Sequence, residues 1–435
     1  GGASFEVPRP PAKDAPADEA RFTLPADISG NFDLTVPAVS YRNGVISNVH
    51  VDAGIGGGEI TISQLSAQLP GGSEVFATGF VTAEQGQPKF DGNLDCRFSN
   101  LRRILDWLDV EIPGVPSDRL RKVDFKGRVT ADAKQIQGTS LNVTVDTSTI
   151  TGGITWALRK RVAFGAALKV DRVNLDAYLN GDAAVSEGGT ETGNAASRQG
   201  GDAATRTGQA GGNPLAFLHF LRSFDANLRL EVGHLTYRRL PIQGLEFDGT
   251  LVGGGLDIRR LGVADFADAN GNVTGKLVGL NDVPGAEKLQ FDLREVDVSR
   301  LLRQFEVDPP IAAGDLGIAQ VTGQVDGSLL RPDLDLVFKT ADASVDLDGK
   351  MSVLPLAPLF DGTVKVRHAD FVQFLRLLGV DYRPSGHVDG LALSTHVKGG
   401  LKSAAFDDLA AKVGTVDVKG SLKYDGTGAR PRIDA

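Results

Sequence analysis

The sequence is poor in sulfur and in large aromatic side chains. Its 435 residues include one cysteine, one methionine, two tryptophans and five tyrosines. The single cysteine, Cys96, excludes an internal disulfide framework and a zinc site built from cysteines. No run of about twenty apolar residues is present, so no segment is expected to cross a bilayer as a helix. A secretion signal is also absent. The chain starts at Gly-Gly and stops in mid-pattern, so we interpret both ends as cuts.

Clustered positive charge is missing as well. The chain carries 46 Lys and Arg residues against 55 Asp and Glu residues, which gives a net charge of −9. Proteins that bind nucleic acid through phosphate contacts need Lys and Arg gathered on one surface. We therefore expect no nucleic-acid partner.

Glycine, by contrast, is abundant. The 54 glycines make up about twelve per cent of the chain, against roughly seven per cent in an average protein. Many glycines with few aromatic residues are typical of short strands joined by tight turns. The composition therefore favours a mostly β protein.

One stretch of sequence occurs twice, at residues 31–52 and 227–248. Both copies alternate apolar and polar residues and carry a Tyr-Arg pair near the middle, at Tyr41 and Tyr237, which are 237 − 41 = 196 residues apart. The same spacing relates these pairs further along the chain: Gly127 and Gly323, Val129 and Val325, and Phe164 and Phe360. Such constant spacing indicates two copies of one module, residues 31–179 and 227–375.

Composition divides the chain further. The start is rich in Pro, Ala and Asp, and a later stretch holds almost nothing that can be buried. The resulting division is a linker or truncated end at 1–27, a first β-groove module at 28–179, a disordered low-complexity insertion at 180–213, a second β-groove module at 214–378 opening with a short helix at 214–224, and the start of a truncated third unit at 379–435.

Brief helical patterns interrupt the strands at equivalent places. Ser99 is a candidate N-cap for a helix over 101–108, and Ser299 for one over 301–305. Asp370 is expected to open a third over 371–378, and a shorter one is expected at 175–179. We therefore predict an elongated, curved, mostly antiparallel β-sheet or groove, built from repeated modules with short helices between strands.

No motif for catalysis, metal or cofactor binding stands out. None of the six histidines has a metal-ligand spacing. His50 and His368 fall among the polar positions of alternating strands, so both are expected to be exposed. His387 and His396 lie on neighbouring expected strands and form only a weak metal candidate. The Gly-rich run 54–58 is followed by a strand pattern, which predicts a hairpin turn rather than a phosphate cradle. We expect no catalytic residue, no metal and no cofactor.

The remaining candidate is the apolar face of the sheet. An ordinary sandwich buries such a face in a core or an oligomer interface, whereas a long sheet that curls can leave it open for a ligand or partner. Alternation with polar neighbours predicts the following residues as lining of this groove: Val49, Val51, Leu228, Leu230, Val232, Leu245, Phe247, Leu334, Leu336, Phe338, Val364 and Val366.

Several stretches resemble the AsmA-like family, which is related to TamB and to the bridge-like lipid-transfer proteins. The resemblance is greatest over residues 214–354, where PLAFLHFLRSFDANLRLEVGHLTYRRLPIQGLEFDGTLVGGGLDI looks like the family's sequence of helix, strand, Tyr-containing turn and strand. FGAALKVDRVNLDAYL, at 164–179, resembles a family strand that ends in a Leu-Asp-x-Tyr-Leu step before a low-complexity insertion. These motifs are diffuse patterns without a catalytic signature.

The resemblance implies a periplasmic protein of a Gram-negative bacterium, tethered to the inner membrane by an N-terminal anchor that this sequence does not contain. Its apolar trough would carry phospholipid acyl chains between the inner and outer membranes, without enzymatic activity, in outer-membrane biogenesis and homeostasis. The main alternative is a scaffold or assembly factor that binds outer-membrane assembly proteins through its sheet edge. A carbohydrate-acting β-solenoid is disfavoured, because such proteins need aromatic platforms for sugars and this chain has few aromatic residues.

Overall fold

The computed structural model describes most of the chain. The described ranges are residues 21–110, 115–159, 161–179, 224–237, 239–266, 268–280, 283–300, 317–352, 359–377, 380–384, 390–400, 402–427 and 432–435. The predicted insertion at 180–213, most of the predicted helix at 214–224, the predicted helix at 301–305, and His387 lie outside these ranges. No helix in the described ranges combines the length and the apolar character that crossing a bilayer requires.

Strands dominate the described ranges. The first half of the chain forms β1 (Gly30–Tyr41), β2 (Gly44–Gly56), β3 (Glu59–Leu69), β4 (Ser73–Glu84), β5 (Gln87–Phe98), α1 (Leu101–Trp107), β6 (Val123–Ala131), β7 (Gln135–Val145), β8 (Ser148–Ala157), β9 (Ala163–Asn174) and α2 (Asp176–Leu179). The second half forms β10 (Asp225–Tyr237), β11 (Leu240–Val252), β12 (Gly255–Phe266), β13 (Ala269–Val278), β14 (Gly285–Asp297), β15 (Ile318–Ser328), β16 (Arg331–Lys339), β17 (Ala343–Ser352), β18 (Leu359–His368), α4 (Phe371–Leu377), β19 (Leu391–Gly400), β20 (Ser403–Val413), β21 (Val416–Asp425) and β22 (Arg432–Asp434).

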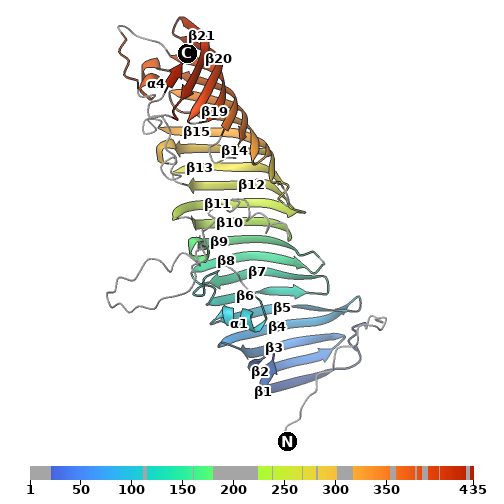
Figure 1. Cartoon of the computed structure of the whole chain (residues 1–435). Helices are drawn as coiled ribbons and strands as arrows, with labels where there is room; N and C mark the ends of the chain where they lie inside the picture. Colours follow the sequence, from blue (N-terminus) through green and yellow to red (C-terminus); the bar gives the residue numbers. More distant parts are fainter. Residues whose placement is uncertain are drawn as a thin grey trace, which may run out of the picture.

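All 22 strands of the described ranges belong to one sheet. Each strand pairs with the next one along the chain, so the sheet rises from β1 to β22 in sequence order (Figure 1). The pairs are antiparallel except β9–β10, which run parallel from Asp225 opposite Ala163 to Thr236 opposite Asn174. The predicted elongated, curved, mostly antiparallel sheet is confirmed, and it continues without a break past the site of the 180–213 insertion.

The repeat seen in the sequence recurs in the strands. The offset of 196 carries the start of β2 at Gly44 onto the start of β11 at Leu240, and the start of β7 at Gln135 onto the start of β16 at Arg331. Through the same offset each strand from β1 to β9 has its counterpart from β10 to β18. The two copies therefore share one order of strands, turns and helices.

Two-residue turns close many hairpins. Gly57 and Gly58 both have positive φ between β2 and β3, and Gly253 and Gly254 do the same between β11 and β12. Positive φ at both central residues is the geometry that matches the twist of a hairpin, and glycine adopts it without a steric penalty. The prediction that the Gly-rich run 54–58 forms a hairpin turn is confirmed.

In the described ranges, α1, α2 and α4 all follow strands that end on the same side of the sheet. We call this row of strand ends the helical rim, and the row of opposite strand ends the hairpin rim. α1 follows β5, α2 follows β9 and α4 follows β18. The Asp370 carboxylate accepts from the backbone N–H groups of Val372 (2.8 Å) and Gln373 (3.0 Å), which confirms it as the cap of α4.

The two predicted serine caps are wrong. The cap of α1 is Asn100, whose Oδ1 accepts from Arg103 N at 3.4 Å, while the Ser99 hydroxyl donates to the carbonyl of Gly72. In the helical turn that begins after β14, Asp297 Oδ1 accepts both from Arg300 N and from the Ser299 hydroxyl. A carboxylate or amide oxygen nearby therefore displaces the serine from the capping position.

α1 folds back along the helical rim over the first hairpins. The Trp107 indole donates to the carbonyl of Tyr41 at 2.8 Å, and the two rings meet edge to face at 6.0 Å. Arg103 lies against Gly71 in the turn between β3 and β4. The helix thus ties together turns that the sheet ladder alone would leave independent.

Candidate functional site

The two faces of the sheet differ sharply in polarity. On β10, Leu228 and Leu230 point to one face, which we call the apolar face, while Arg229 and Glu231 point to the other, the polar face. The same division holds on the neighbouring strands, because residues directly opposite one another in a strand pair share a face. Leu230, for example, stands opposite Phe247, and Arg229 stands opposite Asp248.

The apolar face carries one row of side chains from the first strand to β18. Following directly opposed partners, the central row runs through Leu34, Val51, Leu65, Ala77, Leu94, Gly127, Leu141, Gly152, Leu168, Leu230, Phe247, Leu261, Val273, Phe291, Gly323, Leu336, Leu347 and Val364. The step from Gly127 to Leu141 is diagonal, with the Leu141 side chain lying over the glycine. Every position is apolar or glycine.

The row crosses the junction between the two copies. Leu168 on β9 stands opposite Leu230 on β10, and Val170 stands opposite Val232 beside it. Val170 and Val232 belong to one buried cluster with Leu235. The parallel pairing therefore joins the apolar faces of both copies into one surface.

Parallel rows widen this surface on both sides of the central one. β16 contributes Leu334 and Phe338 on either side of Leu336, in register with Gly349 and Val345 on β17. Four alternate residues span about 20 Å along a strand, and the ladder of strands extends on the order of 100 Å. The apolar face is therefore on the order of 2,000 Å² in area, well beyond the few hundred Å² that a soluble monomer usually exposes in one patch.

Nothing in the described ranges forms a second layer over this face. The strands in extensive contact are all ladder neighbours, and no described strand packs face to face on another. The buried apolar clusters are accordingly small, such as Ala226 with Leu251 and Leu280. Most side chains of the central row are only half-buried, and Leu34 at the edge is 52% exposed.

All twelve residues predicted to line the groove lie on the apolar face. Four of them, Val51, Phe247, Leu336 and Val364, belong to the central row, and the others flank it. Val232 and Leu334 are buried, and the other ten are half-buried. Their shared face is thus an observation, whereas their contact with lipid stays a prediction.

A recurring Phe-Asp-Gly sequence was missed in the sequence reading. It occurs at 90–92, 247–249 and 360–362. The tip of each Phe ring lies over the glycine two residues further on: the ring tips of Phe90, Phe247 and Phe360 come within 2.5, 2.7 and 2.9 Å of the point where a Cβ on that glycine would stand. The rings thereby cover glycine backbone that would otherwise be bare on the apolar face.

The Asp of each Phe-Asp-Gly sequence points to the polar face and pairs with cations on neighbouring strands. Asp91 accepts two hydrogen bonds from Arg128, at 2.8 and 2.9 Å, and Asp361 lies 2.9 Å from His396 Nε2. Hydrogen bonding to these partners holds the pKa of both carboxyls below the usual 3.8. The recurrence of the tripeptide is the sequence signal that would have located these contacts between strands.

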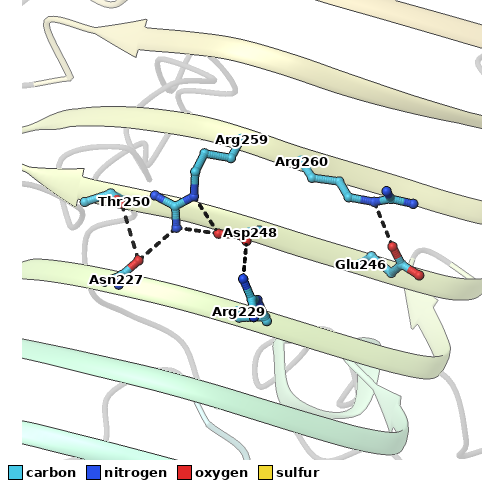
Figure 2. Close-up of polar contacts among 7 residues, drawn as sticks. All are labelled: Asn227, Arg229, Glu246, Asp248, Thr250, Arg259 and Arg260. Carbon is cyan, nitrogen blue, oxygen red and sulfur yellow. Dashed lines mark hydrogen bonds and ion pairs between the residues drawn. The ribbon is translucent and has the colours of Figure 1, made fainter.

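Asp248 is the centre of a network of polar contacts that joins three strands (Figure 2). Its carboxylate accepts from Arg229 Nη2 at 3.0 Å and from Arg259 Nε at 2.7 Å. Arg259 also donates to Thr250 Oγ1 at 2.6 Å and to Asn227 Oδ1 at 2.9 Å. Hydrogen bonds from Arg229 and then Arg259 hold the pKa of Asp248 below its usual value of 3.8.

A β-bulge explains why two arginines meet one carboxylate here. The register shifts between Asp248 and Gly249, so that Arg259 and Arg260 both face the polar side. Arg260 then pairs with Glu246, with Nε 2.8 Å from Oε2 (Figure 2). The three arginines and two carboxylates of this network leave a net charge of +1.

Shallow hollows lie on the polar face, and one of them, lined by five aspartates and one lysine, is acidic. The hollow at the junction of the copies, about 420 Å³, has a floor of small residues that includes Gly153, Gly165 and Ala167. Its wall includes Arg229 and Arg259, and Asp248 between them balances one of their two positive charges. These hollows are local, whereas the apolar face is continuous across both copies, so the apolar face is the stronger candidate site.

The predicted exposure of His368 is wrong. This histidine is only 6% exposed, because α4 turns back over it and places the Phe374 ring 6.0 Å from its own. Its Nδ1 accepts from Asp370 N at 3.0 Å, so the ring helps to start the helix. His50 is half-buried beside Asp33, and within the described ranges no three His, Cys, Asp or Glu side chains gather as metal ligands.

No family model, curated protein or solved structure matches this chain. The resemblance to the AsmA-like family therefore depends only on the sequence patterns given above.

Proposed function

We propose that this protein is a non-enzymatic lipid-binding and transfer protein, which carries phospholipid between the inner and outer membranes in outer-membrane biogenesis and homeostasis. It would act in the periplasm of a Gram-negative bacterium, tethered to the inner membrane. The location and the transport role come from the resemblance to the AsmA-like family. The main structural support is the apolar row that runs from Leu34 to Val364 without a polar interruption, on a face that no described element covers.

Energetics favour acyl chains as the occupant. Each methylene removed from water contributes about 0.8 kcal/mol, so a chain of about sixteen carbons gains on the order of 6 kcal/mol even when only half of its surface is covered. This gain needs no specific contact. A row of similar aliphatic side chains therefore binds an acyl chain with similar strength at each position, which permits movement along the row.

The polar face supports the same proposal by contrast. Its ion pairs, such as Lys169 with Glu231 and Lys350 with Asp333, keep that side of the sheet in water. One side of the sheet is hydrated, and the other is apolar and uncovered. Only the apolar side would therefore gain from being covered by a ligand. We therefore propose this face as the path of the lipid.

Mass spectrometry of lipids extracted from the natively purified protein tests the proposal. The control is the same preparation unfolded, washed free of lipid and refolded. We expect phospholipid in stoichiometric or greater amount in the native sample and none in the control. A folded native sample without phospholipid would refute lipid binding.

One observation favours the scaffold alternative. β1 is an edge strand of twelve residues, and in the described ranges only one of its sides is paired, with β2. It carries one charged residue, Asp33, and its Phe32 and Leu34 are 46% and 52% exposed. Such an edge accepts a strand from a partner protein. This alternative predicts a protein partner bound at β1 and no phospholipid in the native sample.

A further inference from the structure

The hairpin rim near the junction of the two copies carries an exposed tryptophan on the apolar face. Trp156 is 47% exposed, and it stands opposite Ile136 on β7 and Phe164 on β9. Ile136 is also exposed, at 43%, and so is Leu158, at 46%, in the turn that follows. The rim is thus more apolar here than a turn in water requires.

The floor below Trp156 is aromatic and continuous with the apolar face. Phe164 stacks on Phe224 with ring centroids 5.3 Å apart. Both rings pack against the buried cluster that contains Ala226 and Leu251. A ligand held at Trp156 therefore has direct contact with the apolar surface of both copies.

Basic residues follow Trp156 in the same hairpin. Arg159, Lys160 and Arg161 are consecutive in the sequence, and in the described ranges Arg159 and Arg161 share one carboxylate, that of Asp225. Arg161 Nε lies 2.7 Å from Asp225 Oδ1, whereas Arg159 Nη2 lies 3.5 Å from Oδ2 and its side chain is 58% exposed. Because Asp225 also accepts from Gly253 N at 3.1 Å, Arg159 is the loosely held cation of the group.

The other tryptophan of the chain provides a contrast. Trp107 lies on the helical rim, where its indole N–H donates to the Tyr41 carbonyl and its ring packs against Gly44. The indole N–H of Trp156 has no hydrogen-bond partner among the described residues. A tryptophan whose ring lies on an apolar surface, with cations three and five residues further along the same hairpin, is typical of the level of a lipid layer where acyl chains meet headgroups.

We propose that Trp156 and the basic hairpin at Arg159 and Arg161 form a headgroup site for an anionic phospholipid such as phosphatidylglycerol. The phosphate lies beside Arg159, the glycerol level beside the Trp156 indole, and the acyl chains run over Phe164 onto the central row. This inference depends on the proposed lipid-binding function and adds to it the position and charge of the headgroup.

Trp156 fluorescence reports on the site directly. Trp107→Phe leaves Trp156 as the single tryptophan, and Trp156→Phe leaves Trp107 as the matched control. Each full-length variant is loaded with phosphatidylglycerol that carries a nitroxide quencher, either near the glycerol or at the end of one acyl chain. We expect Trp156 to lose most of its fluorescence with the quencher near the glycerol and less with the terminal one, and Trp107 to change little with either. Inorganic phosphate is expected to leave both unchanged.

A charge reversal tests the cation. Arg159→Glu is expected to lower the affinity for phosphatidylglycerol about tenfold, since a hydrogen bond to a charged group contributes about 1.5 kcal/mol. Arg331→Glu, on the same rim in the second copy, is the control and should retain the affinity of the unaltered protein.

The outcomes separate the site from the function. If both variants retain lipid but Trp156 is quenched no more than Trp107, or if Arg159→Glu and Arg331→Glu bind phosphatidylglycerol equally, the headgroup site is refuted and lipid binding stands. Quenching of Trp156 by the terminal nitroxide alone refutes the orientation of the lipid. If the unaltered protein retains no lipid, both proposals fail.

Discussion

The two copies of the module keep the apolar face and change the polar one. Leu34, Val51 and Leu65 in the first copy correspond through the offset of 196 to Leu230, Phe247 and Leu261 in the second. Each set forms three directly opposed neighbours in the central row. Every position of that row is apolar or glycine in both copies.

The polar face at the same place differs in charge. Arg229, Asp248 and Arg259 form the centre of a network in the second copy (Figure 2). The equivalent residues of the first copy are Asp33, Asp52 and Ser63. Asp33 and Asp52 stand directly opposite one another, and in the described ranges Asp52 has no ion-pair partner.

This difference indicates which face constrains the sequence. Solvated charges on a sheet contribute little each, so they can change sign between copies at small cost. A polar residue in the central row would instead interrupt an apolar surface that extends across both copies. The comparison therefore points to the apolar face as the functional one, and each change below tests it.

Arginine in the central row should have the largest effect. Leu347→Arg in the second copy and Leu65→Arg in the first are expected to lower phospholipid transfer between vesicles on the order of 100-fold, because an arginine among acyl chains costs about 2.5–3.5 kcal/mol. Phe247→Arg has the same expected effect, although it also uncovers Gly249. Circular dichroism checks that the variants remain folded.

Thr363→Arg is the matched control for these variants. Thr363 lies on the strand next to Leu347 but on the polar face, opposite Asp348. It should transfer lipid at the rate of the unaltered protein. A folded Leu347→Arg variant with unchanged transfer would exclude this part of the row from the lipid path.

Substitution of the glycines under the phenylalanine rings should have the next largest effect, which is on stability. Gly92→Val and Gly362→Val add side chains against the backbone carbonyls of Thr78 and Asp348 on the neighbouring strands, and against the rings of Phe90 and Phe360. We expect each to lower the free energy of unfolding by about 1–3 kcal/mol, the usual range for overpacking. The control is Gly420→Val on β21, since no atom lies within 4 Å of its added Cβ. Urea denaturation measures the stability of the three variants, and equal stabilities would contradict the close approach of backbone and rings at Gly92 and Gly362.

Changes to the charge network should affect stability less than the glycine substitutions, and the effect should differ between the two copies. Asp248→Asn removes the partner of Arg229 and Arg259, whereas Asp52→Asn removes a carboxylate that faces Asp33. We expect Asp248→Asn to lower the midpoint of thermal unfolding and Asp52→Asn to leave it unchanged or raise it. Transfer activity should be unaffected in both. Equal shifts in the two variants would contradict the account of the polar face.

The smallest predicted effect is on acid stability. The pKa of Asp248 is held below 3.8 by its arginine partners, so its carboxylate stabilises the fold above about pH 3.8 and loses that effect as the pH falls through its lower folded pKa. Below pH 3.8 the stability of Asp248→Asn should therefore fall less steeply than that of the unaltered protein. Urea denaturation between pH 2 and pH 5 measures the slopes, and parallel curves would contradict the assignment.

Much of the fold followed from local patterns in the sequence. Alternation with period two assigned each strand two faces, and this local geometry predicted that Leu228, Leu230 and Val232 share a side. Paired glycines marked the turns, and the constant offset of 196 aligned the copies. These signals act within a strand or a hairpin, so the sequence shows them directly.

Long-range features did not follow. The parallel pairing of β9 with β10 joins strands that are separated by an insertion, and no local pattern reports its register. The burial of His368 depends on how α4 folds back and places Phe374 over it. The cap of α1 depends on the choice between Asn100 and Ser99, which a distant carbonyl at Gly72 decides.

Site-specific photocrosslinking tests the central claim most directly. A benzophenone amino acid is placed at Leu347 on the apolar face or at Thr363 on the polar face of the neighbouring strand, in a Gram-negative bacterium whose phospholipids are labelled with radioactive phosphate. The account predicts a labelled lipid adduct after irradiation from position 347 and none from position 363. Equal labelling of both positions, or no adduct from position 347 in a folded protein, would contradict it.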